Sequence, residues 1–459
     1  MSFQLVVQIV IARILSPEDY GVVAMMTVFI SIATIFINNG FNMAVVQKKD
    51  ADNVDYATAF TINILIGISL YLILFLSSGL IADFYEQPLI KVYLPVLGLL
   101  LVFGSLNSIQ MAIANRNMLF KNLLKCNVTA SLLSGIFGVV AAYLGMGVWS
   151  LIIQQLSSSI ILSIMLFMQQ HWMPRFVINR ESAKSMFSFG WKLLAAGLIN
   201  QVYNELNSLV IGKKYTSGDL AFYTKGNQFP HFLTSGLEGA IGTVIFSALS
   251  KKQNDYAKLH ALMRKSMVTN SYLIFPALAI LGMVATPLTE ILLTEKWLPL
   301  VPFMQICCFT RAFHPVASVQ MQSLSAVGRS DMRLKLEFIK KGIGISLLLL
   351  AVNYGPFAIA VSAAISSIIS IMLGAIACKS AVRYSYTNTI RVLMPITLIT
   401  LVSIVSMYTI SILVTELNSY FQVVVVSLVG FVIYFGISLL THTEGFELLK
   451  SRLLTSSKK

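Results

Sequence analysis

Charged side chains that interrupt long apolar runs are the residues of this sequence best suited to chemistry. Lys225 and Arg311 lie well inside mostly apolar stretches, and Lys192 lies near the end of another. A charge at membrane depth is costly unless it faces a polar cavity or a partner. Cations there offset the charge of a bound anion, and Arg binds phosphate oxygens in a bidentate geometry that Lys lacks. The pattern predicts an anionic-headgroup site formed by Arg311 and Lys225, with His314 and Lys192 beside it.

Further polar residues recur at helical spacing and therefore share helix faces. We expect the following residues to line a polar cavity: Asn200, Tyr203, Asn204, Asn207, Gln228, Glu205, Glu238 and Gln322. Each has a structural alternative, because small polar side chains also join helices to one another within membranes. Lys192 can reach the membrane surface by snorkelling. Lys225 and Glu238 can be structural ion partners of other helices.

The composition restricts the class of protein. Hydrophobic residues make up 56% of the 459 residues and charged residues only 11%, whereas soluble domains carry about 25% charged residues. A soluble enzyme, a disordered chain and a secreted disulfide scaffold are excluded. The four cysteines have no paired spacing, and we expect neither disulfides nor a metal site. The net charge of +14 comes from short clusters without interleaved aromatics, which argues against nucleic acid as a partner.

Apolar runs of about 20 residues predict membrane-spanning helices. The expected spans are 2–15, 21–40, 57–81, 92–114, 124–144, 147–169, 187–212, 219–248, 258–287, 298–326, 336–352, 356–378, 390–414 and 420–441. The first of these is too short to cross a bilayer. The predicted fold class is an all-α polytopic membrane protein with about 14 transmembrane helices, the first of them truncated.

Lys and Arg in the connecting segments predict the orientation of the spans. Of the 33 basic residues, 25 lie in the connections after even-numbered spans or in the C-terminal tail, and only five lie on the other side. Both termini and the 170–186 segment are therefore expected in the cytoplasm. The connections on the outer side are short, and no Walker A loop, HExxH or CxxC pair is present. We expect no cofactor and no external catalytic domain.

Three pairs of similar segments indicate an internal duplication. Residues 10–19 resemble 210–219, 108–111 resemble 318–321, and 163–166 resemble 370–373, at offsets of 200, 210 and 207 residues. Each half then contains six spans. An even number keeps both halves in the same orientation, as in transporters that bind their substrate between two parallel repeats. The alternative is that apolar helices resemble one another through composition alone.

Several blocks resemble a known family. Residues 11–21, I-A-R-I-L-S-P-E-D-Y-G, are similar to the first-loop signature of Wzx-type polysaccharide transporters of the MOP superfamily. The branch that contains the colanic acid exporters is most similar. Residues 187–194, 211–215, 223–225, 228–229, 295–299 and 328–331 agree, although relatives often have Arg in place of Lys225. Relatives also begin with a complete first helix, so we expect about twenty further residues upstream of Met1.

The resemblance implies two six-helix lobes around a central cavity, two additional C-terminal helices and alternating access. The corresponding domains are 1–169, an interlobe linker 170–186, a second lobe 187–380, and 381–459 with the basic tail. It implies a lipid-linked oligosaccharide as cargo in the bacterial inner membrane. A polysaccharide polymerase and chain-length machinery are implied as further partners.

Two other functions are weighed against this one. A cation-coupled multidrug exporter of the same superfamily prefers acidic cavity residues, but Lys192, Lys225 and Arg311 outnumber Glu205 and Glu238 within the spans. A membrane polymerase or ligase needs a substantial external loop with polar catalytic groups, and the outer connections are short. The sequence therefore favours a flippase without enzymatic activity.

Overall fold

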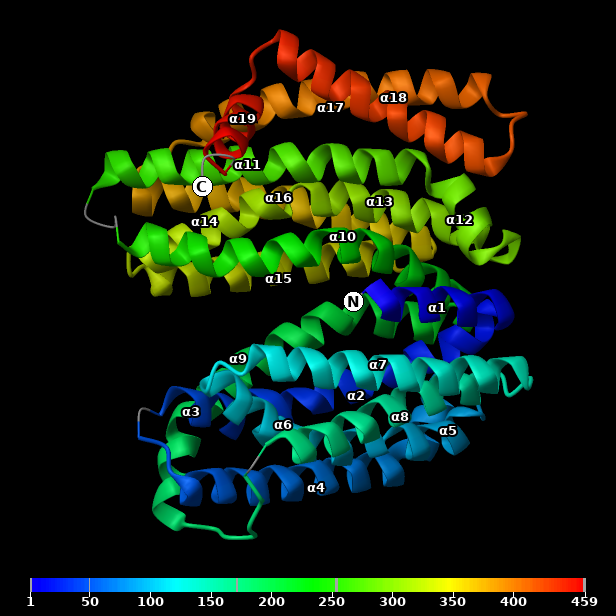
Figure 1. Ribbon diagram of the computed structural model, residues 1–459, viewed down its shortest axis with the longest axis vertical. Coiled ribbons are helices and arrows are strands. Elements are labelled where there is room, and N and C mark those ends of the chain that lie inside the picture. The colour runs from blue at the N-terminus through cyan, green and yellow to red at the C-terminus, as the bar shows by residue number, and fades with distance from the viewer. Residues whose placement is uncertain (1, 49, 171, 252–254, 457–459) are drawn as a thin grey trace. The chain divides into compact units, whose positions relative to one another are not determined.

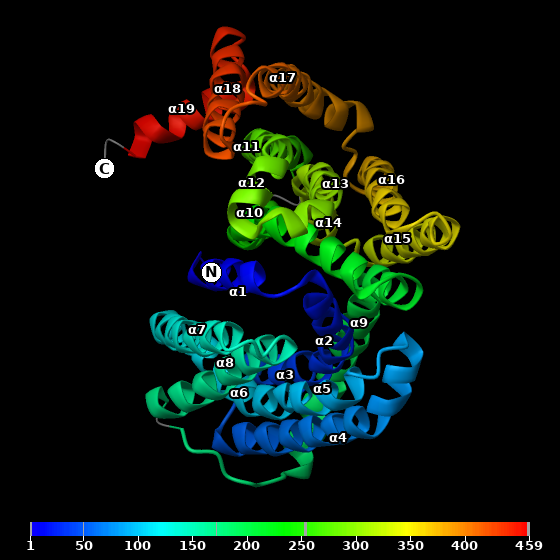
Figure 2. The same ribbon diagram turned by 90° about the vertical axis from the view of Figure 1, so that its right-hand side faces the viewer.

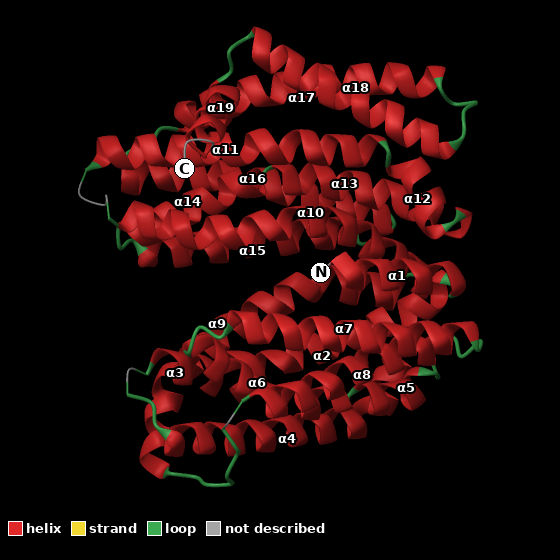
Figure 3. Ribbon diagram, in the orientation of Figure 1, coloured by secondary structure: helices red, strands yellow, loops and turns green. Residues whose placement is uncertain are grey.

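The structure is a computed structural model that describes residues 2–48, 50–170, 172–251 and 255–456. Side chains are described for these residues except 2–3, 189, 236–248 and 452–456. Within this part of the chain every regular element is a helix and no strand occurs (Figure 3). The chain divides into two compact units, Met1–Ala221 and Phe222–Lys459. The all-helical fold class predicted from the sequence is confirmed.

The helices of the first unit are α1 (Ser2–Ile14), α2 (Pro17–Asn39), α3 (Phe41–Gln47), α4 (Asn53–Tyr85), α5 (Ile90–Leu97), α6 (Leu99–Arg116), α7 (Phe120–Tyr143), α8 (Val148–Gln169) and α9 (Arg180–Lys214). Helix α10 (Ser217–Ser250) begins in the first unit and continues in the second. The second unit continues with α11 (Tyr256–Met283), α12 (Ala285–Leu293), the 3₁₀ helix η1 (Glu295–Leu300), α13 (Val301–Ala312), α14 (His314–Ala326), α15 (Ser330–Ala351), α16 (Pro356–Val382), α17 (Tyr386–Leu413), α18 (Ser419–Leu440) and α19 (Glu444–Ser456).

Every apolar run predicted to span the membrane coincides with helical structure. Within the described residues, nine helical segments are long and apolar enough to cross a bilayer. Helices α9, α10 and α15 occupy further predicted spans. The predicted span 298–326 is divided between η1, α13 and α14. The short helices α3 and α12 and the C-terminal helix α19 were not predicted, because none has an apolar run of membrane length.

The two segments paired first in the repeat form the same helix cap. Ser16 Oγ accepts from the Asp19 backbone N–H, and the Asp19 carboxylate accepts from the Ser16 N–H, both at 3.2 Å. At the start of α10, Thr216 and Asp219 exchange the same two bonds, both at 3.1 Å. These reciprocal bonds satisfy backbone donors that the first turn of a helix leaves unpaired. Helix α2 accordingly begins at Pro17 and α10 at Ser217.

In the first unit, α9 lies against α2, α3 and α4 (Figures 1 and 2). Glycines permit the close contact between α2 and α9. A Cβ atom at Gly190 would lie 2.7 Å from the backbone oxygen of Gly40, and one at Gly197 would lie 2.2 Å from Asn39 Nδ2. Small residues allow membrane helices to approach closely in this way. Helix α9 is thus an integral part of the first compact unit.

In the second unit, α11 is the central helix, in contact with α13, α14, α17 and α18. The two last long helices, α17 and α18, pack against each other. Tyr434 on α18 is fully buried and donates its hydroxyl to the backbone oxygen of Tyr272 on α11 at 3.0 Å. A buried Tyr that satisfies its hydroxyl in this way gains both apolar contact and a hydrogen bond.

Candidate functional site

Glu205 on α9 turns toward α2 within the first unit. Its Oε1 atom accepts a hydrogen bond from Ser31 Oγ at 2.9 Å and another from Gln201 Nε2 at 3.0 Å. A carboxylate at this depth needs such donors because water is scarce there. Ser31 is not among the residues that the sequence predicts to line the cavity. The structure pairs it with a particular acid 174 residues away.

The other polar residues of α9 present a different face. Asn200 and Asn204 are exposed, and Tyr203 and Asn207 are half-buried. Residues at positions i, i+4 and i+7 lie on one side of a helix, so Asn200, Asn204 and Asn207 form a continuous polar row. Lys192, two turns nearer the start of α9, is also exposed. The first unit therefore offers an amide-rich surface along α9, in addition to the buried pairing of Glu205.

In the second unit, α10 and α13 lie side by side over the stretch that carries the predicted cations. A Cβ atom at Gly226 would lie 2.9 Å from Phe303 Cβ. Further along, Arg311 Nη1 donates to Thr234 Oγ1 at 3.4 Å. From the first contact to the second, the residue numbers rise along both helices, so α10 and α13 run parallel.

Lys225 and Arg311 therefore lie at two levels of the second unit. Lys225 is only 7% exposed, and it precedes Thr234, the partner of Arg311, by nine residues. With a rise of 1.5 Å per residue, this separation along α10 is about 13 Å. The structure places both cations on the α10–α13 pair.

A break in the helix lies immediately beside Arg311. The predicted single span ends as α13 at Ala312 and begins again as α14 at His314. Pro315, the second residue of α14, has no backbone N–H to donate to the carbonyl of Arg311. The Phe313 backbone N–H donates to the Arg311 carbonyl instead. Arg311 and His314 thus lie on either side of a discontinuity, and discontinuous helices are a common way to form substrate sites in transporters.

The remaining predicted lining residues of the second unit are distributed around this pair of helices. Gln228 and His314 are exposed. Gln322 donates from Nε2 to Ser318 Oγ at 3.2 Å, and its buried Oε1 has no hydrogen-bond partner among the described residues. The side chain of Glu238 lies outside the described residues.

An apolar pocket of about 260 Å³ adjoins the helix break on the side of α11 and α17. Phe309 and Phe313 line it from α13 and the break, Phe275 from α11, and Thr400 and Leu401 from α17. The buried cysteine Cys308 also contributes. The pocket has too few polar groups to bind a charged headgroup, so it does not extend the cation pair into a larger ionic site.

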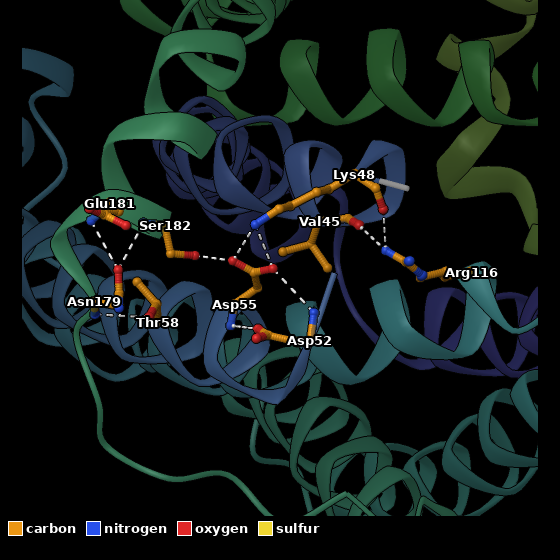
Figure 4. A network of polar contacts seen from close by, with 9 residues as sticks. All are labelled: Val45, Lys48, Asp52, Asp55, Thr58, Arg116, Asn179, Glu181 and Ser182. Carbon is orange, nitrogen blue, oxygen red and sulfur yellow. Dashed lines mark hydrogen bonds and ion pairs between the residues drawn. The ribbon is translucent and has the colours of Figure 1, made fainter. Parts of the chain in front are cut away.

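A polar network that sequence reasoning missed joins the ends of four helices in the first unit (Figure 4). The buried Asp55 carboxylate binds Lys48 Nζ at 2.7 Å and accepts a hydrogen bond from Ser182 Oγ on α9. Asn179, the N-cap of α9, accepts from the backbone of Ser182 and donates its own N–H to Thr58 Oγ1.

The same network includes the end of α6. Arg116 donates to the backbone oxygens of Val45 at 3.0 Å and Lys48 at 2.5 Å. The local signal for part of this arrangement was the Asp-x-x-Asp cap that starts α4 at Asp52 and Asp55. The tertiary partners Ser182 and Arg116 left no signal in the sequence. The network fixes the start of α9 to α3, α4 and α6.

These features define a class. A chain of two all-helical units, with cations on neighbouring apolar helices and a broken span beside one of them, has the architecture of a polytopic membrane transporter. Two solved structures share this fold. The lipid II flippase MurJ in an inward closed conformation matches with a TM-score of 0.74 at 19% identity, covering 96% of each chain. An inward-facing multidrug resistance MATE family transporter of the MOP superfamily matches with a TM-score of 0.64 at 14% identity, covering 85% of this chain and 95% of the other.

The chain belongs to the polysaccharide biosynthesis protein family, whose profile matches residues 10–302. Among curated relatives, an uncharacterized membrane protein in the cps region of Klebsiella pneumoniae is 24% identical over 350 residues, which is 74% of this chain and 71% of the relative. The lipopolysaccharide biosynthesis protein WzxC of Escherichia coli (strain K12) is 24% identical over 338 residues, covering 73% and 69%. The predicted resemblance to Wzx-type proteins of polysaccharide biosynthesis is confirmed.

Proposed function

We propose that this protein is a flippase that moves undecaprenyl-pyrophosphate-linked oligosaccharide units from the inner to the outer leaflet by alternating access. The cargo then serves the assembly of O-antigen, capsule or exopolysaccharide. The observation that carries the proposal is membership of the polysaccharide biosynthesis family in a chain with the fold of a lipid II flippase. The protein acts as a transporter rather than an enzyme.

The cargo contacts follow from charge. A pyrophosphate brings at least two negative charges, whose burial without partners costs many kcal/mol. Lys225 and Arg311 supply fixed positive charge on α10 and α13, with His314 next to the break and Lys192 on α9. The amide row on α9, together with Gln228, Glu205, Glu238 and Gln322, provides the polar lining for the sugar. The proposed domains are a lobe of residues 1–169, a linker of residues 170–186, a second lobe of residues 187–380, and residues 381–459 with the additional helices.

The proposed location is the bacterial inner membrane with both termini in the cytoplasm, on the basis of the 25-to-5 distribution of basic residues. The polysaccharide polymerase and chain-length machinery act on the exported units and are the proposed partners. Because a multidrug MATE transporter has a similar fold, cation-coupled drug export is the second candidate function. The excess of cations over acids within the spans favours the anionic cargo.

The deciding experiment measures leaflet sidedness in cells that depend on this protein. Depletion of the protein is expected to trap lipid-linked units on the cytoplasmic leaflet and to stop surface polysaccharide production. Restoring the chain should release them. Normal export after depletion would contradict the flippase function, and a raised sensitivity to cationic drugs alone would favour the multidrug exporter.

A further inference from the structure

The start of α9 has two chemically distinct faces. Ser182, Met186 and Gly190 are buried at intervals of four residues and pack onto the first unit. The opposite face carries Arg180, Lys184, Phe187 and Trp191, which recur at i, i+4, i+7 and i+11 and are all exposed. Phe187 is 57% exposed and Trp191 48%. Two cations at the helix start are thus followed by two aromatic rings further along the same face.

The connection that precedes α9 continues this pattern. Residues 172–179 form no regular helix, and Met173 and Phe176 are three-quarters exposed, at 76% and 75%. Arg175 lies between them and is also exposed. This connection is fixed to the first unit at both ends. The Trp172 ring packs edge-on against Phe60 at a centroid distance of 5.8 Å, and the Asn179 N–H donates to Thr58 Oγ1 at 3.0 Å.

The length of α9 determines where this face lies in a membrane. The helix has 35 residues, whereas about 20 residues cross the hydrocarbon core. Roughly 15 residues therefore extend beyond the hydrocarbon or lie along its boundary. The irregular backbone of 172–179 cannot lie exposed in hydrocarbon, because its peptide groups would lose their hydrogen bonds. The first turns of α9 and the connection before them consequently lie at the level of the lipid headgroups.

We propose that Arg175, Phe176, Arg180, Lys184, Phe187 and Trp191, which we call the linker face, bind the headgroups of anionic phospholipids. Residues 175–191 contain three cations and one acid, Glu181. None of the three cations forms an ion pair within the described residues. Cations followed by aromatic rings match the gradient from phosphate to acyl chain at a bilayer surface. A soluble protein partner does not require that gradient. The linker face thereby holds the interlobe connection on the lipid surface.

The linker face is tested with the full-length protein in vesicles, without any cargo, so the outcome is independent of the proposed flippase function. Vesicles contain phosphatidylcholine and phosphatidylglycerol at one fixed ratio. In one preparation the phosphatidylcholine carries bromine on its acyl chains, and in the other the phosphatidylglycerol does. The brominated lipid quenches the fluorescence of nearby tryptophan residues. The contribution of Trp191 is the difference between the wild type and Trp191→Phe. We expect brominated phosphatidylglycerol to quench Trp191 more strongly than brominated phosphatidylcholine.

The decisive variant replaces Arg175, Arg180 and Lys184 by Gln. Each cation near an anionic surface contributes about a fivefold preference, so the excess quenching by phosphatidylglycerol should be lost. The matched control replaces Arg329, Arg333 and Lys335 by Gln, which removes the same charge from exposed positions at the α14–α15 connection. The control should keep the excess. Raising the salt concentration should reduce the excess in the wild type.

Three results would overturn the proposal. Equal quenching by the two lipids means that the linker face does not select anionic headgroups. Failure of both lipids to quench Trp191 means that protein covers the face. Equal loss of the excess in the decisive and control variants means that net charge alone, and not this face, attracts the lipid. Thermal unfolding of both triple variants checks that they are folded.

Discussion

At the scale of single residues, Lys225 and Arg311 differ in what they can do for an anion. Lys225 is almost fully buried on α10 and offers a compact point charge. Arg311 is half-buried beside the helix break and already uses Nη1 for a bond to Thr234. Its planar guanidinium has five N–H donors in a fixed arrangement, which suits two oxygens of one phosphate. The two positions are therefore not interchangeable.

Replacement of either cation by Ala is expected to impair export. Hydrogen bonds to charged groups contribute about 1.5–3 kcal/mol, so Arg311→Ala or Lys225→Ala should weaken cargo binding by roughly 10- to 100-fold at normal protein levels. Arg311→Lys should recover only part, because it restores the charge without the bidentate geometry. The measurement is the amount of lipid-linked units that remains on the cytoplasmic leaflet.

Lys335→Ala is the matched control for this prediction. Lys335 is exposed on α15 and lies outside the proposed site, so its loss should leave export unchanged. If both Arg311→Ala and Lys225→Ala export at the wild-type rate, these cations have a structural role and the electrostatic account of cargo selection is wrong.

Asp55 is expected to matter for stability rather than for cargo. Its buried carboxylate forms an ion pair with Lys48 and accepts hydrogen bonds from Ser182 Oγ and the backbone N–H of Asp52. Asp55→Asn removes the charge that these donors share. Since the Lys48 side chain is 37% exposed and its pairing is partly screened by water, the loss should be about 1–2 kcal/mol. The melting temperature in detergent should fall by several degrees. Asp50→Asn, at an exposed neighbouring position, should not change it.

At the scale of elements, glycines determine how closely α2, α9 and the start of α10 pack. A Cβ atom at Gly21 would lie 1.8 Å from the backbone oxygen of Ser217. At Gly212 it would lie 2.9 Å from the Tyr85 ring. A side chain can move aside, but a backbone oxygen at a helix start moves only with its helix. Gly21 is therefore the more restrictive position of the two.

Gly21→Ala is expected to destabilise the first unit. Overpacking of a tight interface costs about 1–3 kcal/mol, and the backbone clash places this substitution at the upper end. Thermal unfolding in detergent and the yield of monodisperse protein measure the effect. Gly79→Ala in α4 is the control, because no described atom lies within 4 Å of the added methyl group. Its helix should become equally or slightly more stable, since Ala is the better helix former. Equal melting temperatures for both variants would contradict the tight packing at Gly21.

Elements were predictable from the sequence to the extent that their signals are local. The Ser16 and Thr216 caps and the start of α16 at Pro356 depend on residues adjacent in the chain. The division at Phe313 was missed, because the apolar run continues through it and Pro315 was not taken as a break. The bonds of Glu205 to Ser31 and of Asp55 to Ser182 join distant segments. No pattern in one sequence specifies such partners.

At the scale of the whole molecule, ion pairs and hydrogen bonds within each unit show which helix ends lie together. In the first unit, Asp55 and Ser182 join the starts of α4 and α9, while Glu86 and Lys213 pair at 2.9 Å at their ends. This bond from Lys213 lowers the pKa of the Glu86 carboxyl below its usual value. Helices α4 and α9 therefore run parallel, as the alternation of spans requires.

In the second unit, the starts of α11 and α19 are joined by Arg264 and Glu444, whose closest atoms are 2.7 Å apart. His260 on α11 contacts the backbone oxygen of Val382 at the end of α16 at 2.8 Å. Ser419 donates to Glu290 at 2.8 Å and joins the start of α18 to α12. Each unit thus has one end rich in Lys and Arg and one end with few of them, which is the arrangement that the positive-inside rule associates with the cytoplasmic and outer faces.

The final prediction is therefore that the basic ends of both units face the cytoplasm. Reporter fusions after Lys184 and Lys459 should be active only with a cytoplasmic reporter, and a fusion after Lys91 only with an external one. Lys184 tests the end that contains the Asp55 network, and Lys91 follows the end of α4 at which Glu86 pairs with Lys213. Because α4 crosses from one end of its unit to the other, the two fusions must give opposite results if it spans the membrane. The same result at both positions would mean that α4 does not cross, and inverted results at all three would mean that lysine and arginine do not set the orientation of this chain.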